Sequence, residues 1–171
     1  MVLENVHDPH NVSAVLRSCD AVGVLQVELL YTVEKFPRIG KKSSSSASKW
    51  VKCRRHRSVA DCFQTLRAEG FFVCATHLAS GSVQLYQMDL TRNVALVFGN
   101  EHRGVSQEVA DLADVNFHIP MVGMIQSLNV SVAAAVSLYE AFRQRNNAGM
   151  YSRPSLSEVR LHALLDEWHA R

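Results

Sequence analysis

Long apolar runs and paired cysteines are both missing from this sequence of 171 residues. No apolar stretch approaches the roughly 20 residues that cross a bilayer, so we expect no membrane partner. The four cysteines form no C-x-x-C pair, which argues against a zinc site or a disulfide frame. Because residues 1–5 already have the pattern of a strand, we expect no signal peptide, and a cytoplasmic protein with reduced thiols and no metal.

Two glycine-rich signatures are also missing. No G-x-G-x-x-G follows any predicted strand, which argues against an ordinary dinucleotide site or a Rossmann-type methyltransferase site. Residues 99–104 have the glycine spacing of a phosphate-binding loop, but Val105 and Ser106 stand where that loop needs lysine and serine or threonine. The sequence therefore disfavours a generic nucleotide-binding module.

Acidic residues are absent from residues 38–57, which we call the basic segment, although the whole chain has a net charge of only +2. Clustered cations bind polyphosphates by releasing counterions, so the basic segment predicts RNA binding. The alternative is a solvated loop face. The RNA-binding candidates are Arg38, Lys41, Lys42, Lys49, Lys52, Arg54, Arg55 and Arg57.

Apolar strands alternate with amphipathic helices along the chain. This pattern predicts an α/β fold, a mostly parallel sheet with helices on both faces, in one domain over residues 1–150 with a helical extension over 151–171 packed on it. Either Asp8 or Asn11 can cap the first helix, and we expect Asn11 at or before the cap. Predicted strands cover residues 1–5, 24–31, 71–76, 94–98 and 115–119, with a short strand at 50–53; predicted helices cover 12–21, 58–69, 106–113, 129–145 and a segment from 158 onward; residues 35–49 are a predicted loop.

The rest of the chain is organised around the stretch 119–145. Its helical part is apolar almost all round, which predicts burial on more than one side. Ser127 and Asn129 stand near the start of that helix, where free backbone N–H groups favour a polar or anionic ligand. The alternative is that one of them is only an N-cap.

Three loops follow predicted strand ends, at residues 76–81, 99–104 and 120–129. Ligands of parallel α/β sheets bind beyond the carboxyl ends of the strands. Gly99, Gly104 and Gly123 in these loops suggest that backbone passes close to a ligand. We therefore expect the binding site where the three loops meet.

Three segments resemble the ordered motifs of one protein family. Residues 11–23 (NVSAVLRSCDAVG), 97–105 (VFGNEHRGV) and 119–133 (IPMVGMIQSLNVSVA) resemble motifs 1, 2 and 3 of the SpoU/TrmH class of RNA 2′-O-methyltransferases. The resemblance implies a SPOUT fold, whose C-terminal part is threaded into a deep trefoil knot, and an obligate homodimer. It also implies S-adenosylmethionine (AdoMet) as cofactor, with S-adenosylhomocysteine as product. The cofactor-binding residues that it implies are Thr76, His77, Leu78, Gly99, Glu101, Ile119, Met121, Ser127 and Leu128.

The resemblance also implies the catalytic residues. The motif 1 arginine, Arg17, is the essential group, as base or base assistant acting with an RNA phosphate, or as the anchor of that phosphate. Asn11 positions Arg17 and the RNA, whereas Glu101, Ser127 and Asn129 hold the motif 2 and motif 3 loops and line the active site. The implied substrate is tRNA, methylated at the ribose of its D-loop guanosine 18. A ribosomal RNA methyltransferase and a non-catalytic RNA-binding paralogue are the alternatives.

Overall fold

The computed structural model of the protein describes residues 1–37 and 47–170. Its elements, in chain order, are β1 (Val2–Glu4), α1 (Pro9–Ala21), β2 (Gln26–Leu30), α2 (Ala47–Trp50), β3 (Lys52–His56), α3 (Val59–Ala68), β4 (Phe72–Thr76), β5 (Val83–Gln84), the 3-10 turn η1 (Leu85–Gln87), β6 (Val94–Phe98), α4 (Gln107–Leu112), β7 (Val115–His118), α5 (Val130–Asn147) and α6 (Glu158–His169).

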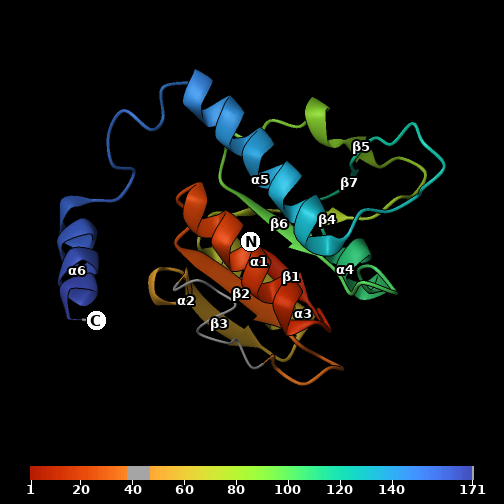
Figure 1. Cartoon of the computed structure of the whole chain (residues 1–171), viewed down its shortest axis with the longest axis horizontal. Helices are drawn as coiled ribbons and strands as arrows, with labels where there is room; N and C mark the ends of the chain where they lie inside the picture. The colour runs from red at the N-terminus through yellow and green to blue at the C-terminus, as the bar shows by residue number, and fades with distance from the viewer. Residues whose placement is uncertain (38–46, 171) are drawn as a thin grey trace.

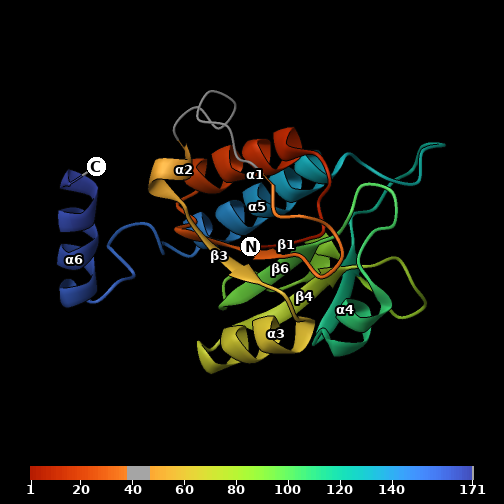
Figure 2. The same cartoon turned by 90° about the horizontal axis from the view of Figure 1, so that it is seen from below.

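The strands of the described residues form one parallel sheet of seven strands in the order β3-β2-β1-β6-β4-β7-β5. Helices α1 and α5 lie side by side on one face of this sheet, and α3 and α4 lie on the other (Figure 2). The predicted α/β class, with a parallel sheet covered on both faces, is confirmed. Because the strands are parallel, their carboxyl ends meet at one edge of the sheet.

Each face of the sheet has its own apolar core. Leu16 of α1 and Ala134 of α5 are fully buried on one face. Phe63 of α3 and Val109 of α4 are buried on the other. Burying a side chain as large as leucine or phenylalanine stabilises a fold by about 1.5–3 kcal/mol, so both helix layers are fixed to the strands that carry the loops.

The first helix begins earlier than predicted. Its N-cap is Asp8, whose carboxylate accepts the N–H of His10 at 2.8 Å, and Pro9 takes the first helical position. Proline suits that position because its φ is already helical and the missing N–H would have no partner. The prediction that Asn11 lies at or before the cap is wrong, since Asn11 lies inside the first turn.

The edge of the sheet at β3 was also predicted imperfectly. The short strand expected at residues 50–53 is instead the end of α2 followed by the longer strand β3, and α2 begins inside the predicted loop. The cationic side chains of β3 break the apolar pattern by which a strand is recognised in the sequence. Such charges are common on edge strands. The two-residue strand β5 was missed because it is too short to show any periodicity.

Within the part of the chain that the structure describes, helix α5 is buried on one side only. Its N-cap is Asn129, whose side chain accepts the N–H of Ser131 at 2.9 Å. Val130 and Leu138 face the core, whereas Val132 and Tyr139 are 47% and 53% exposed. A second buried face of α5 would therefore have to come from another molecule.

Helix α6 stands apart from the sheet at the end of an extended segment (Figure 1). None of its residues is buried. Trp168 packs edge-on against Trp50 with ring centroids 5.7 Å apart, and Glu167 forms an ion pair with Lys52. These contacts join α6 to α2 and β3, and the division of the chain at residue 150 stays a prediction. Within the described residues, no helix is long and apolar enough to cross a bilayer.

Candidate active site

A cavity of about 410 Å³ opens at the carboxyl edge of the sheet, where the loops after β4, β6 and β7 meet. All nine residues implied as cofactor ligands line it: Thr76, His77, Leu78, Gly99, Glu101, Ile119, Met121, Ser127 and Leu128. Its volume lies in the range of about 300–1,000 Å³ that is typical of small-molecule sites. The structure therefore brings the three predicted loops together, while the role of each lining residue stays a prediction.

A chain of three polar side chains connects the three motif segments at this cavity. Asn11 donates from Nδ2 to Glu101 Oε1 at 2.9 Å, and it accepts from Asn129 Nδ2 at 3.2 Å. Asn129 in turn caps α5, as the N-cap alternative predicted, whereas its role as a site residue stays a prediction. The amide of Asn11 thus positions the motif 2 loop relative to the start of the motif 3 helix.

Glu101 is an anchoring carboxylate. Besides Asn11, it accepts the backbone N–H groups of His7 at 2.8 Å and Asp8 at 3.1 Å, directly before α1. Burial opposes the charge, but these hydrogen bonds outweigh it and lower the pKa of the Glu101 carboxyl. Because it stays ionised and its oxygens are engaged, Glu101 is suited to holding the loop and poorly suited to exchanging a proton.

Arg17 does not lie in the cavity of its own chain. Its side chain is exposed on α1, and it is not among the residues that line the cavity. Within residues 1–37 and 47–170, its guanidinium has no hydrogen-bond or ion-pair partner. The prediction that Arg17 points into this site is not met within one chain, and the free cation is available to RNA or to a second subunit.

Gly99 is required by the protein backbone itself. A Cβ at this position would lie 2.1 Å from the carbonyl carbon of Gly104 and 2.2 Å from the nitrogen of Val105. The close approach belongs to a hairpin in which Asn100 and Gly104 exchange backbone hydrogen bonds of 2.9 and 2.8 Å. At Gly123, by contrast, a Cβ would meet nothing within 4 Å. Hairpin geometry therefore accounts for the glycine at position 99, and contact of these glycines with a ligand stays a prediction.

Two cations of the basic segment pair with acidic side chains in the structure, although the segment itself contains no acid. Arg54 donates to Glu28 at 2.8 Å and to Glu69 at 2.6 Å, and these acids raise the pKa of its guanidinium. Lys52 pairs with Glu167. The acids come from β2, α6 and the end of α3, so the acid-free sequence window could not show them. Arg54 is therefore a structural cation rather than a free RNA ligand.

The other cations of the basic segment differ from Arg54. The guanidinium groups of Arg55 and Arg57 lie 5.1 and 4.1 Å from the ring centre of Phe36, and Lys49 is exposed on α2. Their role in RNA binding stays a prediction. Arg38, Lys41 and Lys42 lie outside the described residues.

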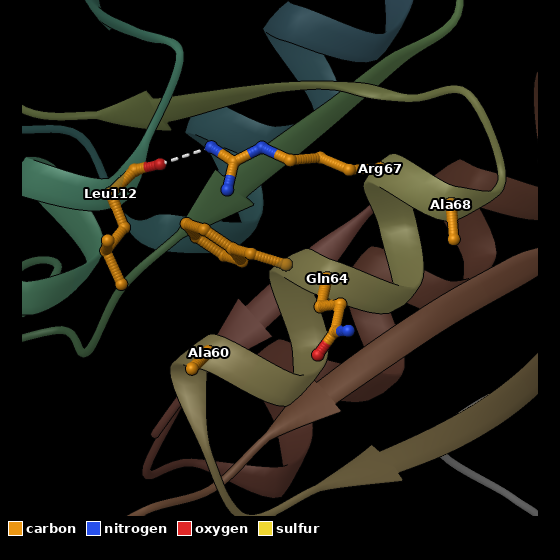
Figure 3. A pocket seen from close by; sticks show the side chains of 6 residues that line it. Ala60, Gln64, Arg67, Ala68 and Leu112 are labelled. Atoms are coloured by element: carbon orange, nitrogen blue, oxygen red, sulfur yellow. Dashed lines mark hydrogen bonds between the residues drawn. The ribbon is translucent and has the colours of Figure 1, made fainter.

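A second hollow, of about 610 Å³, lies between α3 and α4 (Figure 3). Arg67 crosses it and donates to the carbonyl of Leu112 and to the carboxylate of Asp114. Its lining contains no motif residue. Because its one charged group is already paired, we assign the chemistry to the cavity at the carboxyl edge.

Several residues that line the active-site cavity were not among the predicted site residues, and Asn100, Arg103 and His118 are three of them. His118 could have been predicted as a site residue because it ends β7 at the carboxyl edge of the sheet. Its Nδ1 lies 2.8 Å from Ser82 Oγ. Asn100 and Arg103 stand in the motif 2 loop, where the glycine spacing could have drawn attention to the residues between Gly99 and Gly104.

A parallel α/β sheet with a ligand-sized cavity among the loops at its carboxyl edge defines a ligand-binding protein of the open-sheet class. The sequence profile of the SpoU rRNA Methylase family matches residues 1–139. The chain belongs to this family. It is therefore a methylase of the SpoU kind, and the motif 1, 2 and 3 resemblance is confirmed.

Relatives and solved structures agree with this assignment. The chain is 46% identical over 168 residues to a tRNA (guanosine(18)-2′-O)-methyltransferase of Thermus thermophilus, covering 98% of this chain and 86% of that protein. It is 44% identical to the protein of the same name from Escherichia coli, covering 96% and 72%. The crystal structure of the Aquifex aeolicus TrmH/SpoU tRNA modifying enzyme matches with a TM-score of 0.91 and 42% identity, covering 98% and 85%. The AdoMet complex of AviRb from Streptomyces viridochromogenes matches with a TM-score of 0.78 and 26% identity, covering 85% and 60%.

Proposed function

We propose that the protein transfers a methyl group from AdoMet to the ribose 2′-hydroxyl of guanosine 18 in tRNA. The observation that carries this proposal is the cavity lined by the motif 2 and motif 3 segments, to which Asn11 of motif 1 is joined by its hydrogen bonds with Glu101 and Asn129. The relatives of that name, at 44–46% identity, support the choice of tRNA.

The cavity fits the cofactor in character as well as volume. The side chains of Leu78, Ile119 and Leu128 give it apolar walls that suit an adenine ring. The carboxylate of Glu101 places a negative charge in the same lining, which suits a cationic sulfonium. AdoMet, when bound, supplies an electrophilic methyl group.

The chain's residues then have two tasks, which are to place the ribose and to stabilise its phosphate. A 2′-hydroxyl is a weak nucleophile, so its oxygen must be held in line with the methyl group, and its proton must pass to a base or to solvent as the bond from oxygen to methyl forms. Asn11 and Asn129 hold the mouth of the site in shape. Arg17 is always protonated, so we assign it to the RNA phosphate beside the attacked ribose.

We also propose a symmetric homodimer of the SPOUT type, with the C-terminal part of the fold threaded as a trefoil knot. Exposed apolar side chains support the dimer: Val132 and Tyr139 on α5, and Val122, Met124 and Ile125 on the preceding loop. Patches of this kind mark interaction sites, and closed two-fold pairs are the commonest assembly. The dimer would offer Arg17 of one subunit to RNA held by both. A stable species of 19.1 kDa in light scattering would contradict it.

The proposal is tested by methyl transfer from labelled AdoMet to total tRNA and, separately, to ribosomal RNA, followed by nuclease mapping. We expect the label in tRNA at the 2′-O of guanosine 18, and we place the reaction in the cytoplasm because tRNA is its substrate. Label in ribosomal RNA alone would favour the ribosomal alternative, and no label in either would favour a non-catalytic paralogue.

A further inference from the structure

A closed ring of contacts at the cavity mouth joins the motif 2 loop to the segments that follow β1 and β2. It begins at Asn5, directly after β1, which is 6% exposed and has a φ of 49°. The side chain of Asn5 accepts the N–H groups of Val33 and Glu34, both at 3.1 Å, and donates to the hydroxyl of Thr32 at 3.0 Å. Asparagine tolerates this left-handed conformation better than most residues. Asn5 thus fixes the backbone that carries Glu34.

The ring continues into the motif 2 loop. Asn100, which is 7% exposed, donates from Nδ2 to the carbonyl of Asn5 at 2.8 Å. Its Oδ1 accepts the N–H groups of His102 at 3.0 Å and Arg103 at 3.3 Å. The side chain of Arg103 then closes the ring, because its Nη2 donates to Glu34 Oε1 at 2.9 Å. Two buried amides therefore fix the backbones of two residues whose side chains meet at the surface.

The stability of the fold does not explain the ion pair between Arg103 and Glu34. The Arg103 side chain is 58% exposed and that of Glu34 is 30% exposed, and an ion pair in such surroundings adds little to stability. Only Nη2 of the guanidinium has an acceptor within the described residues, which leaves its other N–H donors for a ligand. Arg103 also lines the active-site cavity. A planar guanidinium held at the mouth of a cavity is suited to binding a phosphate through two parallel hydrogen bonds.

We propose that Arg103 binds a phosphate of the substrate RNA at the cavity mouth, and that Glu34 holds its guanidinium in place until the phosphate replaces the carboxylate. This inference rests on the proposed function only in taking RNA as the substrate. It assigns to Arg103 a contact that positions the target nucleotide. Glu34 acts only through Arg103, because its carboxylate occupies one N–H group of the guanidinium and competes with the phosphate for it.

Two single variants test the inference, because each removes the same ion pair. Binding of an unmodified tRNA transcript is measured at several salt concentrations. Arg103→Gln should weaken binding about tenfold, the expected loss of one charge-assisted hydrogen-bonded contact. It should also reduce the slope of log affinity against log salt by about one, as the loss of one phosphate contact predicts. Glu34→Gln should instead strengthen binding about two- to fivefold, because an exposed carboxylate no longer competes.

The double variant is the control for a general charge effect. If Glu34 acts through Arg103, the gain from Glu34→Gln disappears in the Arg103→Gln background. Equal loss of affinity in both single variants would show that the ion pair only stabilises the local structure, and this would overturn the inference. So would an unchanged affinity and salt slope in Arg103→Gln.

Failure of the proposed function gives a different result. Methyl transfer by the wild-type protein is measured on the same transcript. Transfer by the wild type together with normal RNA binding by Arg103→Gln overturns only the phosphate contact. Loss of RNA affinity in Arg103→Gln with no transfer by the wild type overturns only the methyltransferase proposal.

Discussion

Two arginines that the sequence marks as candidate RNA contacts have opposite surroundings in the fold. Arg54 is held at the β3 edge by Glu28 and Glu69. Arg17 is exposed on α1 with no partner within the described residues. Arg54, bound by acids of its own chain, stabilises the fold, whereas the exposed Arg17, unpaired within residues 1–37 and 47–170, can contact a substrate. Local charge density in the sequence therefore does not rank cations by function; their partners in space do.

Removing Arg17 should give the largest effect. Arg17→Ala is expected to lower methyl transfer at saturating AdoMet and tRNA about 100-fold or more, because a charged contact to the reacting nucleotide is lost. Thermal unfolding and AdoMet binding should stay unchanged. Arg17→Lys should recover little, since a point charge cannot replace a planar fork.

Asp20→Ala is the matched control on the same helix, because Asp20 is also exposed. It should leave turnover near the wild-type value. Near wild-type turnover in Arg17→Ala would mean that Arg17 is only a solvated helix cation.

A glycine pair should give the next largest effect. Gly99→Ala would place a methyl group 2.1 Å from the backbone of Gly104, so the hairpin must move. We expect AdoMet affinity in calorimetry to fall about tenfold or more and the unfolding temperature to fall with it, since overpacking costs about 1–3 kcal/mol. Gly123→Ala meets nothing within 4 Å and should change neither quantity. Equal behaviour of the two variants would contradict the hairpin explanation.

Removing Arg54 should separate stability from activity. Arg54→Ala leaves the buried Glu28 carboxylate with fewer partners, and we expect a loss of about 1–3 kcal/mol in the free energy of unfolding. Methyl transfer at a temperature where the variant is folded should stay close to that of the wild type. Arg55→Ala, one residue along β3, should cost only about 0.5 kcal/mol. A large loss of turnover in folded Arg54→Ala would return this residue to the RNA-binding set.

The same network predicts a smaller, pH-dependent effect. Burial opposes the charge of Glu28, but hydrogen bonds from Arg54, Gln26 and His56 lower the pKa of its carboxyl below the ordinary 4.5. A carboxyl with a lowered folded pKa stabilises the fold above the unfolded value and loses that stabilisation as the pH falls through the folded pKa. The difference in unfolding free energy between wild type and Glu28→Gln should be constant above about pH 5. It should shrink on further acidification, and a difference that grows instead would contradict this sign.

The sequence predicted what local patterns determine. Continuous apolar strands such as Val94–Phe98 identified a parallel sheet, and three loops at strand ends located the cavity. The cap of α1 was misplaced because Asp8 and Asn11 are both good caps, and only Pro9 at the first helical position favours Asp8.

Contacts between distant segments could not be predicted from the pattern. Glu34 and Arg103 are 69 positions apart, and Arg54 and Glu28 are 26 apart, so neither pair appears in any local window. The exposure of Val132 and Tyr139 was hidden for a related reason, since an apolar helix has the same sequence whether the chain or a partner covers it.

The most direct test of the account uses two tRNA transcripts that differ by one oxygen atom. One carries ordinary guanosine at position 18, and the other carries 2′-deoxyguanosine there. With labelled AdoMet, we expect one methyl group per molecule of the first transcript and none in the second, while both bind the protein with similar affinity. Equal methyl transfer to both transcripts would place the acceptor elsewhere and would contradict the proposed reaction.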